Sequence, residues 1–224
     1  MRIFLAGASG VIGIRLVPLL VDAGHAVAGM TRTPAKAQML RSLGAEPVVG
    51  DVYDAAAVAD AVVAFGPDVV MHQLTDLPDD VRLIRDRAAD DARIRREGTR
   101  NLLAAARAAA ATRFLAQSVA WELPGDGSTA TADLERAVLD GGGVVLRYGR
   151  FYGSGTYYET TLPPPPRVDV DRAAAGTVAA LDAEPGIVTI VDEEPNTPAA
   201  RAAAAGDLAR QHRRPRRMAR RESR

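Results

Sequence analysis

A turn with three glycines near the N-terminus constrains the fold of this chain more than any other feature. Its sequence is Gly7-Ala8-Ser9-Gly10-Val11-Ile12-Gly13, and it joins a strand-like segment at residues 2–6 to a helical stretch at residues 11–23. Glycines at this spacing allow a tight turn, a close approach of backbone to a pyrophosphate, and close packing of helix on strand. The helix N-terminus also offers unpaired N–H groups and a favourable dipole to phosphate oxygens. The turn therefore predicts a dinucleotide site formed by Gly7, Ser9, Gly10, Val11, Ile12 and Gly13.

The first 150 residues alternate between short apolar runs and longer alanine-rich stretches. Strands that alternate with helices form right-handed βαβ units around a parallel sheet. The apolar runs are continuous in Val, Ile and Leu, as in strands buried on both faces. We therefore expect an α/β fold, a Rossmann-type doubly wound parallel sheet. The predicted strands are residues 2–6, 26–30, 46–49, 68–72, 113–117 and 143–146, and the predicted helices are 11–23, 34–43, 54–65, 84–111 and 130–140.

The pattern changes after residue 146. Three glycines and a run of four prolines at residues 163–166 indicate loop, and a helix at 172–183 and a strand at 186–191 are predicted to follow. Beyond this strand the composition turns to alanine and arginine. We expect one folded domain over residues 1–192 and a frayed or disordered Arg/Ala-rich tail over residues 193–224.

The charges of the chain are balanced overall but unevenly placed. The net charge is +0, yet residues 201–224 hold nine arginines against Asp207 and Glu222. The acidic remainder has no basic clustering, which argues against a nucleic-acid partner. The sequence has no cysteine, no apolar run of about 18 residues, and no signal-peptide pattern at its N-terminus. We expect a cytoplasmic protein with no membrane partner, and no metal site, since no ligand cluster is evident.

Two basic residues after the second predicted strand bear on the choice of cofactor. NAD-selective sites place an acidic residue here to bind the ribose 2′-hydroxyl, whereas an arginine suits a 2′-phosphate. Arg32 stands 19 residues past Gly13, and Lys36, the single lysine of the chain, follows one helical turn later. The pair favours NADP, with NAD as the alternative. Two solvated basic residues near a helix start would give the same pattern.

Three segments together resemble one enzyme family. They are the glycine turn, the run Val69-Val70-Met71-His72-Gln73-Leu74, and the loop Arg147-Tyr148-Gly149-Arg150-Phe151-Tyr152-Gly153-Ser154-Gly155. In these segments the chain resembles the NAD-dependent epimerase/dehydratase group of the extended and atypical short-chain dehydrogenase/reductases. The likeness covers roughly residues 1–192.

The resemblance implies roles for further residues. Asp51 and Val52 stand where the family contacts the adenine, and the backbone of His72, Gln73 and Leu74 would flank the cofactor. Ser118 stands at the end of the fifth strand, where the family keeps a catalytic Ser or Thr. Simple hydrogen bonding at a strand end is the alternative for this residue. Family members have a fuller substrate lobe, so residues 147–192 would form a small, curtailed one. A homodimer through residues 84–111 and 130–140 is also implied.

The acid/base pair of that family is missing from this sequence. The family uses Tyr-x-x-x-Lys, in which the lysine lowers the pKa of the tyrosine and binds the nicotinamide ribose. Here the residue four before Lys36 is Arg32. If Glu135 is aligned with the glutamate that usually follows the family's lysine, Gly127 and Thr131 take the tyrosine and lysine positions.

If the chain is an enzyme of this kind, it would use a non-standard proton donor. Tyr148, in the loop on the nicotinamide side, is the leading candidate, and Arg147 or Arg150 would have to lower its pKa from the ordinary value of about 10. Tyr152 and His72 are alternatives, although core packing is the commoner role for such residues.

Two functions stay open at this point. The first is an NADP-binding oxidoreductase or epimerase-like enzyme, with Ser118 and Tyr148 as catalytic residues and a carbonyl or sugar-type small molecule as substrate. The second is a catalytically silent NADP-binding sensor or regulator. The absence of a Tyr-x-x-x-Lys pair favours the second function. The loop at residues 147–155, which resembles that of the family, favours the first.

Overall fold

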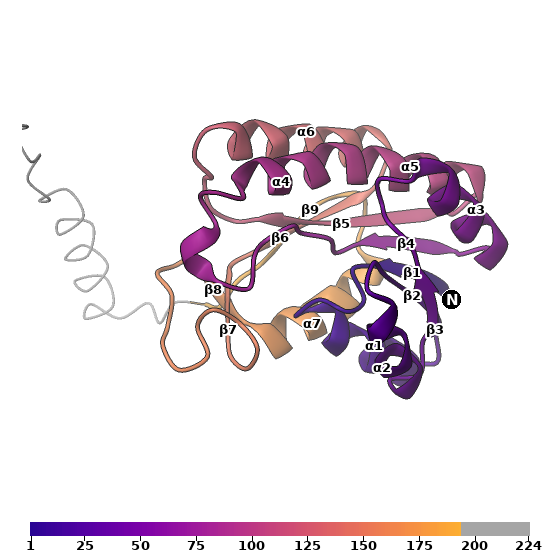
Figure 1. The fold of residues 1–224 in the computed structure, drawn as a ribbon, viewed down its shortest axis with the longest axis horizontal. Coiled ribbons are helices and arrows are strands. Elements are labelled where there is room, and N and C mark those ends of the chain that lie inside the picture. The colour runs from indigo at the N-terminus through magenta and orange to yellow at the C-terminus, as the bar shows by residue number, and fades with distance from the viewer. Residues whose placement is uncertain (194–224) are drawn as a thin grey trace, which may run out of the picture. The chain divides into compact units, whose positions relative to one another are not determined.

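A seven-stranded sheet with helices on both faces forms the body of residues 1–193, the part of the chain that the computed structural model describes (Figure 1). The strand order is β3-β2-β1-β4-β5-β6-β9, and every neighbouring pair is parallel. The strands are β1 Arg2–Ala6, β2 Ala26–Thr31, β3 Glu46–Val49, β4 Val69–His72, β5 Arg113–Val119, β6 Val144–Tyr148 and β9 Gly186–Ile190. The predicted Rossmann-type α/β fold is confirmed.

The helices divide between the two faces of this sheet. Helices α3, α4, α5 and α6 cover one face, and α1, α2 and α7 cover the other (Figure 1). Their bounds are α1 Gly13–Asp22, α2 Ala37–Ser42, α3 Ala55–Phe65, α4 Ala88–Arg93, α5 Thr99–Ala108, α6 Asp126–Asp140 and α7 Val170–Ala179. Short helical turns lie at Pro34–Lys36, Val81–Leu83, Ile94–Gly98 and Ala180–Asp182.

The core consists of two layers because successive side chains of a strand point to opposite faces. On β1, Leu5 packs with Leu16 of α1, whereas the preceding residue, Phe4, packs with Val62 of α3 and Leu102 of α5. All five side chains are fully buried. This burial on both faces explains the continuous apolar runs of the sequence.

The strand order reverses next to β1. The chain passes from β1 to β2 and β3 on one side, then crosses to β4, β5 and β6 on the other. In open parallel sheets of this kind, ligands bind in the crevice outside the carboxyl ends of the strands at the point of reversal. The glycine turn follows β1 directly and therefore lies at this crevice.

Several predicted boundaries differ from the structure, most of all at three helices. The helix predicted over residues 84–111 begins at Ala88, contains a π turn at Ile94–Gly98 and ends at Ala108. Helix α6 begins at Asp126, four residues before the predicted start, because Gly127 lies within its first turn and weakens the helical pattern. The helix predicted over residues 11–23 begins at Gly13 and ends at Asp22.

A second, two-stranded parallel sheet was not predicted. It pairs β7 Arg150–Tyr152 with β8 Arg167–Asp169, and Gly149 alone separates β7 from the end of β6. Strands of only three residues carry too little pattern to be recognised. This small sheet holds the loop at residues 153–166 beside the carboxyl edge of the main sheet.

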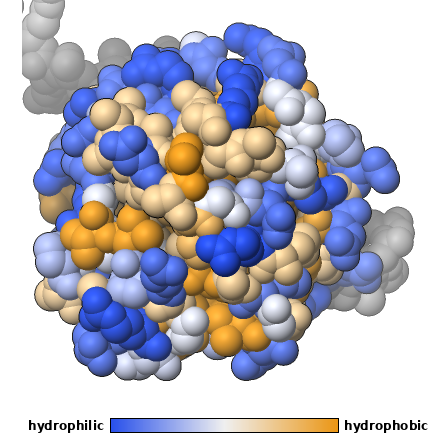
Figure 2. Space-filling model, turned by 90° about the vertical axis from the view of Figure 1, so that its right-hand side faces the viewer, coloured by the Kyte–Doolittle hydropathy of each residue, from blue (hydrophilic) through white to orange (hydrophobic). Residues whose placement is uncertain are grey.

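The surface that carries β3 and α3 shows apolar side chains in small groups separated by hydrophilic ones (Figure 2). Val49 and Val63 are among its exposed apolar residues. Scattered groups of this kind are ordinary for a protein surface. None of the helices within residues 1–193 is both long and apolar enough to cross a membrane. The predicted tail at residues 193–224 lies outside the described residues except for Glu193.

Candidate functional site

The glycine turn has the close packing that its sequence predicts. Gly7 has a positive φ of 91°, and a Cβ on it would lie 2.5 Å from the carbonyl oxygen of Gln73, just after β4. A Cβ on Gly13 would collide with the Gly7 carbonyl oxygen. The turn and the end of β4 therefore approach each other as closely as backbones can, and no side chain at Gly7 or Gly13 would leave the turn intact.

This turn leaves hydrogen-bonding groups free for an anion. Gly10 donates its N–H back to the Gly7 carbonyl at 3.0 Å, which closes the turn. Within the described part of the chain, the N–H groups of Val11 and Ile12 donate to no other backbone group. They lie at the N-terminus of α1, where the helix dipole favours negative charge. The turn therefore fits the pyrophosphate of a dinucleotide.

The residues after β4 adjoin the glycine turn, as the resemblance implied, but the His72 side chain points elsewhere. Its imidazole is fully buried, accepts a hydrogen bond from the N–H of Leu74 at Nδ1, and lies 3.1 Å from Thr99 Oγ1 at Nε2. Burial, aided by the charge of Arg95, lowers the pKa of His72 to about 3. A buried neutral imidazole cannot act as an acid or base at the cofactor rim.

The side chain of Gln73 has one amide atom that is hydrogen-bonded and one that is not. Its amide Nε2 donates to the Tyr148 hydroxyl at 3.1 Å. Its Oε1 is buried and has no partner among the described residues. A buried acceptor without a partner is costly, so this atom suits a ligand that donates a hydrogen bond.

The basic residues predicted for the adenosine end are exposed and lie near the turn. Lys36 Nζ lies 3.5 Å from the Ser9 carbonyl oxygen, and the Ser9 hydroxyl is 2.8 Å from that of Thr31 at the end of β2. Arg32 Nη2 donates to Asp76 Oδ1 at 2.7 Å. No sequence pattern indicates Asp76, which occupies part of the Arg32 guanidinium.

Asp51 and Val52, the two residues predicted to contact the adenine, differ in exposure. Asp51 is exposed, and its Oδ1 accepts the N–H of Tyr53 at 3.0 Å. Val52 is buried in the α3–α5 layer, and its carbonyl accepts a hydrogen bond from the Asn101 side chain at 2.9 Å. The exposed carboxylate of Asp51 is thus accessible to a hydrogen-bond donor such as the adenine amino group. Val52 has no free polar group and can only pack against a ligand.

Ser118 belongs to a hydrogen-bonded cluster at the ends of β5 and β6. Its hydroxyl donates to Glu135 Oε1 at 2.6 Å, and Arg147 forms two hydrogen bonds to the same carboxylate, at 2.8 and 2.5 Å. Burial alone would raise the pKa of Glu135, but the hydrogen bonds from Arg147 and Ser118 outweigh it and hold the pKa below its ordinary value. With its proton committed to Glu135, Ser118 has none to donate to a substrate carbonyl in this arrangement.

Tyr148 lies in the core rather than on an accessible surface. Its side chain is buried, and its hydroxyl lies 2.6 Å from that of Thr177 on α7. Burial raises the pKa of Tyr148 well above its ordinary value. Neither neighbouring arginine counteracts this, since Arg147 bonds to Glu135 and Arg150 lies over Trp121. This placement favours a packing role over proton donation. Tyr152, the alternative, donates to Asp192 at 2.7 Å.

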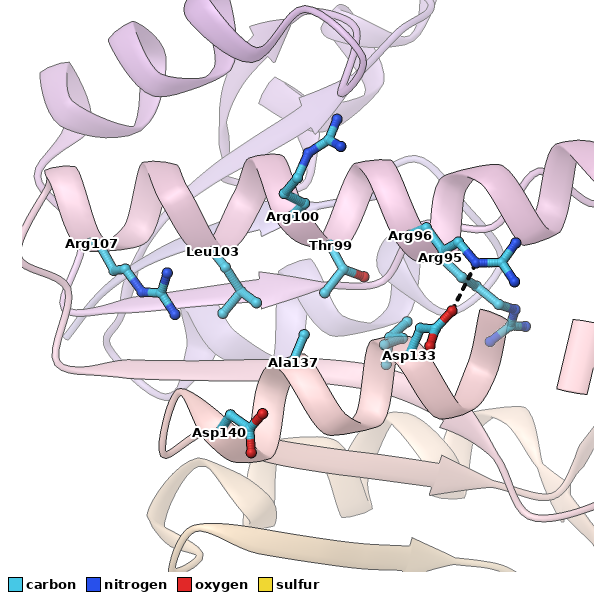
Figure 3. Close-up of a pocket in the computed structure, with 10 residues that line it drawn as sticks. Arg95, Arg96, Thr99, Arg100, Leu103, Arg107, Asp133, Ala137 and Asp140 are labelled. Carbon is cyan, nitrogen blue, oxygen red and sulfur yellow. Dashed lines mark hydrogen bonds and ion pairs between the residues drawn. The ribbon is translucent and has the colours of Figure 1, made fainter. Parts of the chain in front are cut away.

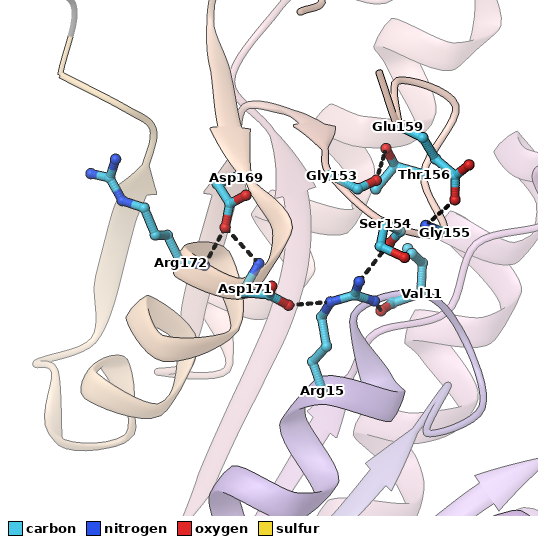
Figure 4. Close-up of polar contacts among 10 residues, drawn as sticks. All are labelled: Val11, Arg15, Gly153, Ser154, Gly155, Thr156, Glu159, Asp169, Asp171 and Arg172. Carbon is cyan, nitrogen blue, oxygen red and sulfur yellow. Dashed lines mark hydrogen bonds and ion pairs between the residues drawn. The ribbon is translucent and has the colours of Figure 1, made fainter. Parts of the chain in front are cut away.

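An arginine on α1 connects the glycine turn to the loop that follows β7 (Figure 4). Arg15 donates to the carbonyl oxygens of Val11 at 2.7 Å and Ser154 at 2.5 Å, and its Nε bonds to Asp171 of α7 at 2.5 Å. No sequence pattern indicates Arg15, because its three partners lie in three separate segments.

A groove of about 450 Å³ lies between α5 and α6 (Figure 3). Leu103 and Ala137 line it together with Arg100, Arg107 and Asp140. None of its lining residues belongs to the glycine turn or to the ends of β1 and β4, so this groove is separate from the candidate dinucleotide site. No group of three or more potential metal ligands occurs within residues 1–193.

Residues 7–138 match a protein family described as NAD(P)H-binding. A 3-diazoavenalumate denitrifying reductase from Streptomyces sp is 38% identical to this chain. The alignment has 242 positions and covers 87% of this chain and 77% of the reductase. A 3-beta-hydroxysteroid dehydrogenase from Mycolicibacterium neoaurum is 32% identical over 51% of this chain and 31% of the dehydrogenase. Because 242 aligned residues exceed the 224 of this chain, the reductase has internal residues that this chain lacks.

Solved structures show the same fold. The UDP-glucose 4-epimerase of Thermus thermophilus, in complex with NAD, has a TM-score of 0.73 and 20% identity, and the match covers 96% of this chain and 85% of the epimerase. The UDP-glucose 4-epimerase of Thermotoga maritima, with UDP-glucose, has a TM-score of 0.69 and 17% identity over 85% of this chain and 77% of the epimerase. The chain therefore belongs to the NAD(P)H-binding family and has the fold of the NAD-dependent epimerases.

Proposed function

We propose that this chain is an NADPH-dependent reductase whose small electrophilic substrate takes up hydride without a proton from an enzyme tyrosine. The observation that carries the proposal is the missing acid. With Glu135 aligned to the family's glutamate, Gly127 and Thr131 take the positions of the tyrosine and lysine, and the Thr131 hydroxyl donates to the Gly127 carbonyl oxygen at 2.8 Å. The site therefore suits a substrate that is already electron-poor.

The similarity to a denitrifying reductase supports a diazo substrate class. We infer that the substrate is an arene carrying a diazonium group. In its reduction a C–H bond forms with the hydride of the dihydronicotinamide, the C–N bond breaks, and dinitrogen leaves with the electron pair of that bond. The nicotinamide is oxidised, and no proton enters the balance. A tyrosine acid is not needed for this chemistry.

The residues of this chain would bind and orient the cofactor. The free N–H groups of Val11 and Ile12 would donate hydrogen bonds to the pyrophosphate. The glycines of the turn, which lack a Cβ, would let the pyrophosphate approach the backbone closely. Arg32 and Lys36 would bind the 2′-phosphate at the adenosine end, which is our reason for proposing NADP over NAD. The unpartnered Oε1 of Gln73 would accept a hydrogen bond from the bound molecule.

A deuterium-transfer assay tests the proposal. The full chain is mixed with NADPH carrying deuterium on one face of C4 and with benzenediazonium, and the benzene and dinitrogen formed are measured by mass spectrometry. We expect deuterium transfer from one face only, above the rate without protein and above that of the Gly13→Ala variant. Reduction of ketones or aldehydes but not of the diazonium salt would refute the substrate class.

The missing Tyr-x-x-x-Lys pair also favours a second candidate function, a catalytically silent NADP-binding sensor. The same assay separates the two. Tight NADPH binding without turnover of a diazonium, carbonyl or nucleotide-sugar substrate would support the sensor and contradict the reductase.

We also propose a homodimer through the groove between α5 and α6. Arg100 and Arg107 line it from α5, and Asp140 lines it from α6, beside the apolar Leu103 and Ala137. A two-fold axis along this groove would place the arginines of one copy opposite the aspartate of the other, which makes the surface self-complementary. Sedimentation equilibrium tests this. The natural chain should be a dimer and Arg107→Glu should weaken it, whereas a monomeric natural chain would contradict the proposal.

A further inference from the structure

The region beyond the carboxyl ends of β5 and β6 holds a second polar feature, separate from the glycine turn. Trp121 is two residues past the end of β5, and Arg150 begins β7, two residues past the end of β6. The two strands are neighbours, with Val119 in register with Tyr148. Trp121 and Arg150 are therefore brought together at the edge of the sheet where ligands of this fold bind.

Arg150 lies against the ring of Trp121 and is anchored by backbone oxygens. Its Cζ is 4.6 Å from the ring centroid, within range of a cation–π contact. Its Nη1 donates to the carbonyl oxygen of Pro165 at 3.0 Å and lies 3.4 Å from that of Pro164. These contacts hold the guanidinium in one place.

Arg150 differs from the other arginines around the crevice because it lacks an acidic partner. Arg15 bonds to Asp171, Arg32 to Asp76 and Arg147 to Glu135. Within residues 1–193, no carboxylate lies within ion-pair distance of Arg150. Burial lowers the pKa of Arg150, opposed only by the nearby Tyr158. A half-buried cation without a counter-charge is a favourable partner for an anion.

We propose that Arg150, held in place by Trp121, is a substrate subsite that binds the carboxylate of an aromatic acid. A guanidinium offers a planar fork of donors that matches a carboxylate, and its Nη2 and Nε donate to no described residue. The indole adds a flat apolar surface on which the ring of such an acid can pack. This subsite rests on the proposed reductase function and names its substrate as an arene carboxylate.

The chain carries its own reporter for this test, because Trp121 is its single tryptophan. The fluorescence of Trp121 in the full-length protein is followed during titration with phenylacetate, with phenylacetamide and with acetate. We expect a saturable change with phenylacetate and a response at least about tenfold weaker with the neutral amide and with the non-aromatic anion. No hydride transfer takes place in this experiment, so its outcome is independent of the reductase assay.

Variants assign the binding to Arg150. Arg150→Gln should weaken phenylacetate binding by about tenfold or more, and Arg150→Lys should retain part of it. Arg41→Gln, at an exposed position of α2, should leave the binding unchanged. Circular dichroism verifies that each variant is folded. If Arg150→Gln does not fold, the comparison of Arg150→Lys with Arg41→Gln decides. Equal binding of phenylacetate and phenylacetamide, or no saturable response to phenylacetate, would overturn the proposal.

Discussion

Arg32 and Asp76 form an ion pair across the ends of β2 and β4, with 2.7 Å between Nη2 and Oδ1. The hydrogen bond to Asp76 raises the pKa of Arg32, and Asp76 also accepts a hydrogen bond from Tyr53 at 3.3 Å. The guanidinium that suits a 2′-phosphate is thus already engaged by a carboxylate. The proposed preference for NADPH would therefore require the 2′-phosphate to compete with Asp76.

Substitution of Asp76 tests this competition. Asp76→Asn should strengthen NADPH binding by about threefold to tenfold, because it removes a negative charge near the 2′-phosphate. Arg32→Ala should weaken NADPH binding by about tenfold or more and leave NADH binding nearly unchanged. Fluorescence titration with both nucleotides measures the effects. Weaker NADPH binding by Asp76→Asn would show that Asp76 supports the cofactor rather than competing with it.

Gly13→Ala should abolish the binding of both nucleotides. The added Cβ would collide with the Gly7 carbonyl oxygen, so the turn cannot keep its shape. Gly141→Ala is the matched control, because its Cβ would lie 3.4 Å from its nearest neighbours, an ordinary contact, at the end of α6 away from the turn. Unchanged NADPH affinity in Gly13→Ala would place the cofactor elsewhere.

Ser118→Ala separates a catalytic serine from one that organises a cluster. The hydroxyl is committed to Glu135, so we expect turnover within a few-fold of the natural chain and a loss of about 1–3 kcal/mol in the free energy of unfolding. Urea unfolding and single-turnover rates measure the two effects. A hundredfold loss of turnover with unchanged stability would instead support direct contact of Ser118 with the substrate.

Tyr148→Phe tests the buried tyrosine in the same way. Loss of its hydrogen bonds with Thr177 and Gln73 should lower the free energy of unfolding by about 1 kcal/mol, while the turnover rate should change little. Tyr157→Phe, at a half-exposed position, serves as the comparison. A large fall in turnover for Tyr148→Phe alone would restore this residue as the proton donor.

The burial of His72 predicts a pH dependence of stability. Folded His72 stays neutral down to about pH 3, whereas the unfolded chain takes up a proton at this residue below about pH 6.5. Its contribution to stability is therefore present above pH 6.5 and is lost as the pH falls toward 3. The unfolding free energy of His72→Gln should fall less steeply in this range, by up to about 1.4 kcal/mol per pH unit. His25→Gln, at a partly exposed position, should keep the steeper slope.

The order of strands and helices could be predicted from the sequence because each element carries a local pattern. The continuous apolar run of β4 and the glycine turn after β1 are examples. The short strands β7 and β8 could not be predicted, because their pairing of Arg150 with Arg167 joins residues 17 positions apart with no periodic signal.

The candidate site was predicted in part for the same reason. Spacing predicted the close packing of the glycine turn, because the backbone requirement of each glycine is local. It could not show that the His72 and Tyr148 side chains point into the core, because strand residues alternate between faces and both faces are buried here. Nor could it find Asp76 or Arg15, whose partners are distant in the sequence.

Titration of the full chain with NADPH and with NADH, followed by the fluorescence of the reduced nicotinamide, tests the central claim most directly. We predict saturable binding at one site per chain, tighter for NADPH than for NADH, and lost in Gly13→Ala. Absence of saturable binding of either nucleotide by the folded protein would contradict the assignment of a dinucleotide site to the glycine turn.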